Sequence, residues 1–390
     1  MLRLPQILLA LKPNRIPLSR RICLMSSKRC LIYIPPEPRD TTDKPFSFSV
    51  LPLTTDVPGG GRALVTTVTG SFYLGSRKNT NLSEVWFVPY FDFEGRYGLP
   101  VRSYIWLDRN KWALRGDMRI LKYPEYTYGL GKLKTDDDKL LVDRSYLRVY
   151  QQIFRQVSPG LLLGVGYHLD VNSKIKTNSQ DPTLTQFSGY NYGTTNGTTS
   201  TSSGISFDLL YDTRGSSINA SKGSYLNITY RMNPEFMGSD RYWHSLYVDA
   251  KKYYRLTKSP ERQNLIALWS YYWTTFNSNA PYFDLPSIGW DDFNTSGRGF
   301  QQSRFRAKSL FYLEAEYRKD ITRDGLLGFT LFSNLNSTED YKNPLFSKWS
   351  LGVGGGLRIK VDKLSGTNIS LDYGFSRGYH GFYITLGEYF

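Results

Sequence analysis

Apolar and polar residues alternate one by one through most of the chain from residue 45 onward. The clearest example is the segment 311–318 (FYLEAEYR), with Phe, Leu, Ala and Tyr at the odd positions and Tyr, Glu, Glu and Arg at the even ones. Because successive side chains of a β-strand point to opposite faces, this strand has one apolar and one charged face. In a soluble sandwich the apolar face would pack on a second sheet, whereas in a membrane barrel it would face lipid.

The alternation recurs often enough to favour one of these folds. It is repeated in 111–121, 222–233 and 367–376, where charged or amide side chains again stand opposite apolar ones. It predicts about sixteen strands, at 45–54, 62–74, 81–94, 99–108, 111–121, 142–157, 160–171, 204–213, 222–233, 240–255, 263–275, 307–320, 326–336, 347–361, 367–376 and 380–390. So many half-charged strands favour an all-β, transmembrane antiparallel β-barrel with a polar lumen.

Connection lengths give an independent test, because outer-membrane barrels have short periplasmic turns and longer outer loops. With this set of strands the long connections all fall at one end of the barrel: 123–141, 172–203, 277–306 and 335–347. The short links fall at the other end: 157–160, 320–326 and 362–366. We expect 277–306, the sixth outer loop, to fold inward. We expect 172–203, rich in Ser, Thr, Asn and Gly, to be a mobile surface loop.

Composition agrees with a membrane barrel and excludes other classes. The chain has 390 residues and a formal net charge of +15. Its Lys and Arg residues are spread along the strands and do not form a patch on a helix, so we expect no nucleic-acid partner. No run of about eighteen apolar residues is present, which excludes a transmembrane helix.

Residues 1–44 form a separate segment before the predicted barrel of residues 45–390. The segment is basic, contains several prolines and both cysteines (Cys23 and Cys30), and begins with a short apolar stretch that Pro5 and Gln6 interrupt. We expect it to be disordered. It is either a poor export signal or the product of a wrongly placed start codon.

A group of charged residues is predicted to share the inner face of the barrel. It comprises Arg298, near the tip of the long loop, and the strand residues Glu314, Glu316, Arg318, Arg358 and Asp372. Two interpretations remain open: a generic polar lumen, or an ion-pair network that docks the loop tip on the wall. In the second, Arg298 needs a carboxylate partner, because burying a guanidinium alone is costly. Glu316 or Asp372 is expected to be the nearest one.

No catalytic or metal-binding arrangement is evident. His168 and His380 are expected at or near strand ends and His244 on an outward position, without metal-ligand spacing. The run 352–356 (GVGGG) lies inside a strand with no helix after it, so it is not a nucleotide loop. Its glycines are expected to relieve crowding or to admit the loop that folds inward. We therefore expect no enzyme activity, no metal and no cofactor.

Several motifs together resemble the barrel of the BamA/TamA-like superfamily, the bacterial surface antigen family. Arg298-Gly299-Phe300 resembles the Arg-Gly-Phe/Tyr tip of the family's sixth outer loop, and 313–318 (LEAEYR) resembles the strand after that loop. Three further segments resemble the mid-barrel turn, the next-to-last hairpin and the last strand end: 211–214 with 222–223, 354–358 with 371–373, and 387–390. The resemblance covers roughly residues 45–390.

This resemblance implies a location in the outer membrane of a Gram-negative bacterium and a role in protein insertion, assembly or translocation. The implied partners are outer-membrane lipids, client outer-membrane proteins and the assembly machinery, and the barrel is expected to be a monomer. A passive pore or structural barrel is the alternative. The end of the chain resembles an assembly signal, formed by Phe382, Leu386 and Phe390, and we expect the Phe390 ring at the membrane interface.

Two departures from the family pattern stand out. Family members that insert or secrete proteins carry periplasmic POTRA modules before the barrel, and residues 1–44 are too few for one. Asn334-Leu335-Asn336 stands where the family has Asp-x-Gly. We expect the missing carboxylate to weaken the ion pairing of Arg298.

Overall fold

The computed structural model describes residues 46–56, 62–92, 95–131, 139–177, 183–195, 198–258, 262–339, 344–361 and 366–390. All described residues belong to one compact unit within Leu31–Phe390. The expectations for residues 1–44 lie outside the described residues.

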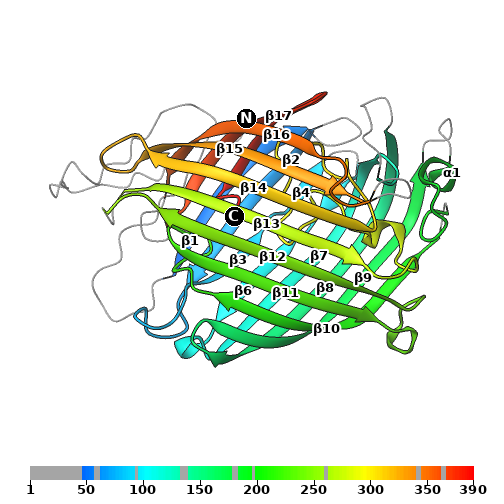
Figure 1. The fold of residues 1–390 in the computed structure, drawn as a ribbon, viewed down its shortest axis with the longest axis horizontal. Coiled ribbons are helices and arrows are strands. Elements are labelled where there is room, and N and C mark those ends of the chain that lie inside the picture. Colours follow the sequence, from blue (N-terminus) through cyan, green and yellow to red (C-terminus); the bar gives the residue numbers. More distant parts are fainter. Residues whose placement is uncertain are drawn as a thin grey trace, which may run out of the picture. The chain divides into compact units, whose positions relative to one another are not determined.

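The described residues form one antiparallel sheet of eighteen strand segments, joined in chain order (Figure 1). The segments are β1 (Ser47–Asp56), β2 (Arg62–Phe72), β3 (Ser83–Phe87), β4 (Tyr90–Asp92), β5 (Tyr97–Gly98), β6 (Val101–Trp106), β7 (Trp112–Thr127), β8 (Leu140–Ser158), β9 (Leu161–Thr177), β10 (Ser200–Asp212), β11 (Gly223–Asn233), β12 (Trp243–Arg255), β13 (Asn264–Thr275), β14 (Ser309–Asp320), β15 (Leu327–Thr338), β16 (Ser350–Lys360), β17 (Asn368–Ser376) and β18 (Tyr379–Leu386). The one α-helix among them is α1 (Leu184–Ser188). No helix in this part of the chain is long and apolar enough to cross a membrane.

Four of the segments make up two interrupted strands. β3 and β4 both pair with β2, and β5 and β6 both pair with β7. Pro89 and Pro100 lie at the two breaks, where a missing N–H interrupts the ladder. Counting each interrupted strand once leaves sixteen, so the predicted strand number and the barrel fold are confirmed.

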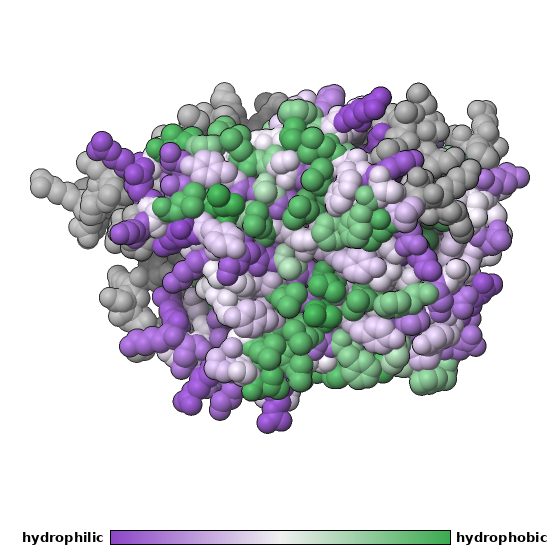
Figure 2. Space-filling view, in the orientation of Figure 1, coloured by the Kyte–Doolittle hydropathy of each residue, from purple (hydrophilic) through white to green (hydrophobic). Residues whose placement is uncertain are grey.

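Burial along the strands is the reverse of that in a soluble protein. On β14 the side chain of Leu313 is 39% exposed, whereas those of Glu314 and Glu316 are buried. The same inversion holds on β17, with Asp372 buried and Tyr373 and Phe375 exposed. Figure 2 shows apolar residues across the middle of the surface and hydrophilic ones toward both ends. An apolar outer face around a charged interior requires lipid outside, as predicted.

The four longest connections, 128–139, 178–199, 276–308 and 339–349, all lie at one end of the strands, as the loop lengths predicted. We call this the long-loop end, and the opposite end the short-turn end. The connection between β9 and β10 is shorter than the predicted 172–203, because β9 continues to Thr177 and β10 begins at Ser200. Leu184 and Tyr190 between them are buried against residues of the 276–308 loop. The prediction of a surface loop was therefore wrong in part. Asn172, Ser200 and Ser202 belong to strands and are buried, whereas Asn191 and Thr195 of the connection itself are exposed.

The end of the chain does not continue as a strand, in contrast to the predicted 380–390. β18 ends at Leu386, and Gly387 has a φ of 106°, a conformation that favours glycine. Phe382 is 62% exposed on the outer face, but Leu386 and Phe390 are buried. The predicted interfacial position of the Phe390 ring is wrong. A straight strand would have placed Glu388 on the lipid side beside Leu386, and the turn avoids this cost.

The inverted burial makes a prediction about charge and depth. Leu331 lies outward in the middle of β15, whereas Leu327 begins the same strand at the short-turn end on the same face. Leu331→Arg should destabilise the barrel by about 2–4 kcal/mol and Leu327→Arg by about 0–1 kcal/mol. Reversible urea unfolding in lipid vesicles measures both. Equal costs would contradict the depth assigned to these residues.

Candidate functional site

The candidate site is the loop 276–308, which joins β13 to β14 and is folded upon itself. The loop includes the short helix η5 (Tyr282–Asp284). Its two arms are joined by backbone hydrogen bonds from Ile288 N–H to the Phe305 carbonyl and from Ser303 N–H to the Ile288 carbonyl, each 3.0 Å. Residues 280–291 are buried throughout. The loop therefore folds inward, as expected.

Arg298 binds three carboxylates of the barrel wall. Its Nη1 lies 2.6 Å from Oδ2 of Asp372 on β17, and its Nη2 contacts Glu314 and Glu316 of β14. The guanidinium also lies between two rings, 3.7 Å from the centre of Phe332 and 4.2 Å from that of Tyr389. The side chain is 1% exposed. Charge-assisted hydrogen bonds and cation–π contact together replace the water that Arg298 loses.

These ion pairs extend into a larger network. Arg318 lies 2.5 Å from Glu316, and Arg358 lies 2.5 Å from Asp372. Glu388 joins the two, at 2.8 Å from Arg358 and 3.7 Å from Arg318. The structure thus brings together every charged residue of the predicted group and adds Glu388. Sequence reasoning missed Glu388 because it treated the end of the chain as a continuous strand.

The network also shifts the pKa of Arg298. Burial alone would lower the pKa of its guanidinium, but Glu314, Glu316 and Asp372 raise the pKa well above its ordinary value. A buried guanidinium without these acids would be strongly unfavourable. The docked loop therefore depends on the acidic wall.

Gly299 and Phe300, the other two residues of the tip, lie close to a part of the wall where glycines replace larger residues. Gly299 has a φ of 91° and donates its N–H to the Tyr383 hydroxyl at 2.8 Å. A Cβ at Gly374 would lie 2.7 Å from the Gly299 nitrogen, and one at Gly352 would lie 2.9 Å from the Arg298 carbonyl oxygen. The glycines of this wall therefore admit the loop, one of the two roles expected for them. The Phe300 ring packs edge-on against Phe305.

Asn334, which stands where the family has a carboxylate, contacts the backbone of the loop tip. Its Nδ2 donates a hydrogen bond of 2.8 Å to the carbonyl oxygen of Arg298. The acids come instead from β14 and β17, so the guanidinium needs no carboxylate at this position. Asn334 therefore binds the backbone of Arg298, while Glu314, Glu316 and Asp372 bind its guanidinium.

A second anchor, absent from the sequence-based prediction, holds the base of the loop. Glu125 of β7 lies 2.7 Å from Arg306 of the loop and 2.7 Å from Arg144 of β8. Trp290 Nε1 donates to the same carboxylate at 3.2 Å. Arg306 also donates to the Tyr282 carbonyl oxygen at 3.0 Å, which ties the two arms of the loop together.

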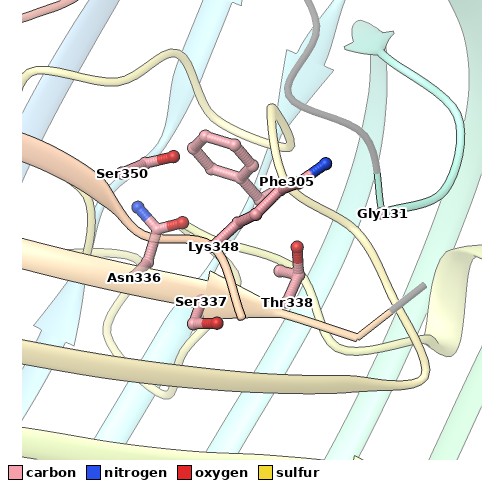
Figure 3. Close-up of a pocket in the computed structure, with 7 residues that line it drawn as sticks. All are labelled: Gly131, Phe305, Asn336, Ser337, Thr338, Lys348 and Ser350. Carbon is pink, nitrogen blue, oxygen red and sulfur yellow. The ribbon is translucent and has the colours of Figure 1, made fainter. Parts of the chain in front are cut away.

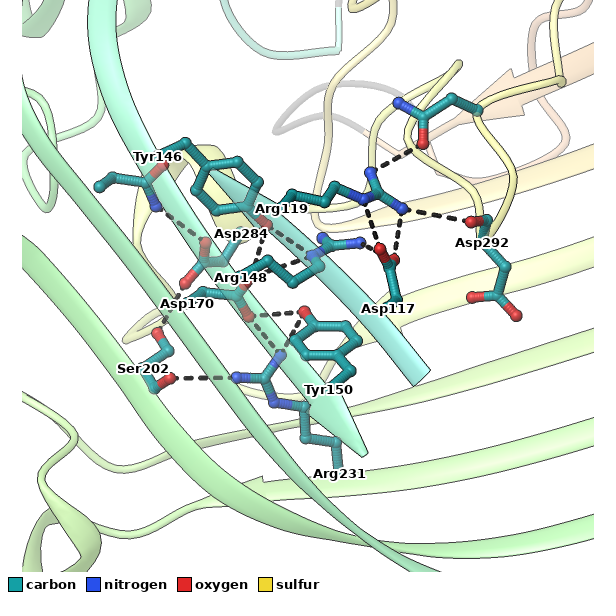
Figure 4. Close-up of polar contacts among 12 residues, drawn as sticks. Asp117, Arg119, Tyr146, Arg148, Tyr150, Asp170, Ser202, Arg231, Asp284 and Asp292 are labelled. Carbon is teal, nitrogen blue, oxygen red and sulfur yellow. Dashed lines mark hydrogen bonds and ion pairs between the residues drawn. The ribbon is translucent and has the colours of Figure 1, made fainter. Parts of the chain in front are cut away.

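A third anchor joins the loop to the wall formed by β7–β11. Arg119 donates to the side chain of Asn294 at 2.8 Å and to the carbonyl oxygen of Asp292 at 3.2 Å (Figure 4). On the other side, Asp284 accepts from Ser202 at 2.6 Å and from Asn172 at 3.1 Å.

Asp170 of β9 organises the wall behind the third anchor. It accepts from Tyr146 and Tyr150 at 2.5 Å each and from Arg231 at 2.6 Å, with Arg148 at 3.3 Å (Figure 4). Inward strand parity could have marked these residues as lumen-facing. It could not have shown which of them meets the loop.

The three histidines lie at separate places in the barrel. His168 is in the middle of β9 and buried, with Nε2 2.9 Å from the Ser206 hydroxyl, so its predicted place near a strand end was wrong. His244 packs on Phe276, and His380 lies 2.9 Å from the Tyr373 hydroxyl. In the described part of the chain, no group of three or more His, Cys, Asp and Glu residues is arranged to hold a metal ion.

The turn between β10 and β11 spans several elements at the short-turn end. Arg214 binds Asp212 through two side-chain hydrogen bonds of 2.8 and 3.0 Å. Further along the turn, Ser217 donates to Glu84 of β3 at 2.6 Å, and Asn219 donates to the Gly366 carbonyl oxygen at 3.0 Å. This motif, 211–214, therefore fixes a turn that bridges distant strands.

One small pocket lies at the long-loop end, between the loop and the ends of β15 and β16 (Figure 3). It measures about 260 Å³, including the space open to solvent. Its lining comprises Gly131, Phe305, Asn336, Ser337, Thr338, Lys348 and Ser350.

The geometry predicts that Arg298→Ala frees the loop tip without unfolding the barrel. The three wall acids would lose their shared cation, and the tip would lose its strongest contact. Limited proteolysis should then cut within 277–306 at least several times faster, while heat-modifiable gel migration stays unchanged. Lys308→Ala, an exposed cation of the same loop, is the control and should behave like the wild type. Unchanged protease resistance in Arg298→Ala would argue against docking through this residue.

Asp284 makes the docking of the loop pH-dependent. Burial, and secondarily the charge of Asp170, raises the pKa of Asp284 to about 6. Arg231 and Arg148 oppose the shift. The docked state therefore binds a proton more tightly than the free loop, so docking strengthens as pH falls from above 6 toward 4 and weakens as pH rises. The effect is at most about 3 kcal/mol.

The test compares wild type with Asp284→Asn. Protease resistance of the wild-type loop should be higher near pH 5 than near pH 7.5, whereas the variant should lack this part of the pH dependence. The difference between the two proteins isolates Asp284 from the other carboxylates. Identical pH profiles would contradict the assignment.

Comparison with known proteins agrees with this geometry. The Omp85 superfamily domain matches residues 106–390, more than half of the chain. Among solved structures, BamA from Haemophilus ducreyi lacking POTRA domains 1–3 is similar with a TM-score of 0.51 and 13% identity, over 92% of this chain and 74% of that one. CdiB from Acinetobacter baumannii is similar with a TM-score of 0.51 and 10% identity, over 85% of this chain and 62% of that one.

The comparison with curated proteins gives no match. The two structural similarities, at such low identity, establish the barrel fold, and the domain match establishes the family. The resemblance drawn from the loop tip and the strands around it is therefore confirmed. The chain belongs to the Omp85 superfamily and is an outer-membrane β-barrel protein.

Proposed function

We propose that this barrel takes part in the insertion, assembly or translocation of proteins at the outer membrane, without enzymatic chemistry. The observation that carries the proposal is the combination of a blocked lumen with a seam between the first and last strands. Membership of the Omp85 superfamily supports the same role for this protein. The client proteins and the assembly partners implied by the resemblance are part of this proposal.

The loop occupies the lumen and is held on several walls. Arg298 binds β14 and β17, Arg306 binds Glu125 of β7, and Asp284 binds residues of β9 and β10. A solute could not cross without displacing these contacts. This arrangement favours a gated protein over the alternative, a permanently open passive pore.

The seam differs from every other strand boundary. Residue-by-residue pairing joins each strand to the next from β1–β2 to β17–β18. Among the described residues no such register joins β18 to β1, and β18 adjoins β2 in the sheet. Leu51 of β1 instead packs with Leu386 and Ile369 through side chains. An edge without a full ladder can accept an incoming strand by backbone hydrogen bonding. Lateral opening at this seam would give a client strand a template.

The experiment measures the folding of a small eight-stranded outer-membrane protein into vesicles that contain the purified barrel. We expect faster folding than in protein-free vesicles. A cross-link between Leu51→Cys and Leu386→Cys, with Cys23 and Cys30 changed to Ser, should remove the acceleration. A cross-link between Leu335→Cys and Leu351→Cys, which face each other within the regular β15–β16 ladder, should leave it intact.

Planar-bilayer recording separates the proposal from the pore alternative. A barrel closed by its loop should conduct rarely, and Arg298→Ala should open more often. A large, steady conductance in the wild type, together with no acceleration of client folding, would favour the passive pore. Acceleration that survives the seam cross-link would refute the lateral mechanism while leaving a role in insertion.

A further inference from the structure

The short-turn end of the barrel carries a strong excess of exposed positive charge. Eleven exposed basic side chains occupy its turns and the adjoining strand ends: Arg77, Lys78, Arg109, Lys111, Arg155, Lys222, Lys252, Lys258, Arg262, Lys319 and Arg323. We call this set the basic rim. Among the described residues of the same turns and strand ends, only Asp108 and Asp324 are exposed acids.

The acids nearby do not neutralise the basic rim. Within the described residues, only Arg109 of the rim forms an ion pair, at 3.5 Å from Asp108. Other acids of this end are buried: Glu84 accepts from Ser217, Asp212 binds Arg214, and Glu388 binds Arg358. Buried Asp320 accepts from the Gln263 N–H and attracts Arg262 of the rim without forming an ion pair with it. The rim therefore presents uncompensated charge to its surroundings.

Several rim residues stand on the lipid-facing side of strands and not at the tips of turns. Lys252 follows the outward parity of β12 and lies with its Nζ 5.6 Å from the ring of Tyr254. Arg155 lies over Trp112, 5.4 Å from the ring centre, and both side chains are exposed. Lys319 stands outward between Tyr317 and Ile321, which is itself 56% exposed.

Basic groups beside aromatic and aliphatic side chains form the arrangement that a lipid interface favours. The ring and methylene groups lie along the acyl region while the cation reaches the headgroup level. Basic residues near an anionic membrane surface are attracted to it within about 8 Å at physiological salt. Because short turns are periplasmic in outer-membrane barrels, the leaflet concerned is the periplasmic one.

We propose that the basic rim binds the anionic headgroups of phospholipids in the periplasmic leaflet and so fixes the depth of the barrel in the membrane. The outward direction of Lys252, Arg155 and Lys319 favours lipid over an acidic protein. A soluble acidic partner would meet the turn tips but not side chains that point away from the lumen into the membrane perimeter.

The test reconstitutes the purified full-length protein in vesicles and measures how strongly it immobilises spin-labelled phosphatidylglycerol relative to spin-labelled phosphatidylcholine. At low salt we expect a preference for phosphatidylglycerol of about two- to fivefold. The preference should disappear at about 1 M salt, where electrostatic attraction is screened within about 3 Å. This salt comparison needs no variant and cannot be confounded by misfolding.

A charge-matched pair of variants locates the site. The rim variant combines Lys252→Gln, Lys258→Gln, Arg262→Gln and Lys319→Gln. The control variant combines Lys139→Gln, Lys174→Gln, Lys176→Gln and Lys308→Gln, which removes as many exposed charges from the long-loop end. Heat-modifiable migration verifies that both are folded. The rim variant should lose at least half of the lipid preference, and the control should keep it.

Three results would overturn the proposal. The first is a wild-type protein without preference for phosphatidylglycerol, and the second is a rim variant that keeps the wild-type preference. The third is binding of a soluble polyglutamate peptide to the wild type but not to the rim variant, with no lipid preference in either. That last result would identify an acidic protein as the partner of the rim.

Discussion

A single buried guanidinium constrains much of this structure. Arg298 is surrounded by Glu314, Glu316 and Asp372 and covered by two aromatic rings. Such a group is stable in the interior only when acids and hydrogen-bond acceptors take the place of water. The inner faces of β14 and β17 must therefore be acidic, and the wall must come close to the loop backbone.

The other features of the lumen follow from this requirement. Gly352 and Gly374 leave space for the loop tip, and the chain turns at Gly387 so that Tyr389 covers the guanidinium. The acids that neutralise Arg298 also bind Arg318 and Arg358, so the charge of the loop is shared with the wall. The lumen is a connected polar network and not a generic hydrophilic surface.

Strand parity explains how much of this could be predicted from the sequence. Period-two alternation fixes which side chains face inward, so the sixteen strands and the acids near Arg298 were predictable. It does not fix which residues meet across a loop: Glu125 and Arg306 are 181 positions apart, and no local pattern connects them. The turn at Gly387 was missed because one glycine overrides an otherwise regular strand. Glu388 could have indicated this turn, because a continued strand would have placed its carboxylate on the lipid side.

The position of the partners of Arg298 along the chain has a consequence for the order of folding. All the wall residues that bind the loop tip come later in the chain than the tip itself. Asp372 lies in β17, and Tyr389 comes after β18. The tip cannot take its final place until the last strands are present beside β14. Docking is therefore a late event in folding, and a docked loop reports that the C-terminal part of the barrel has been completed.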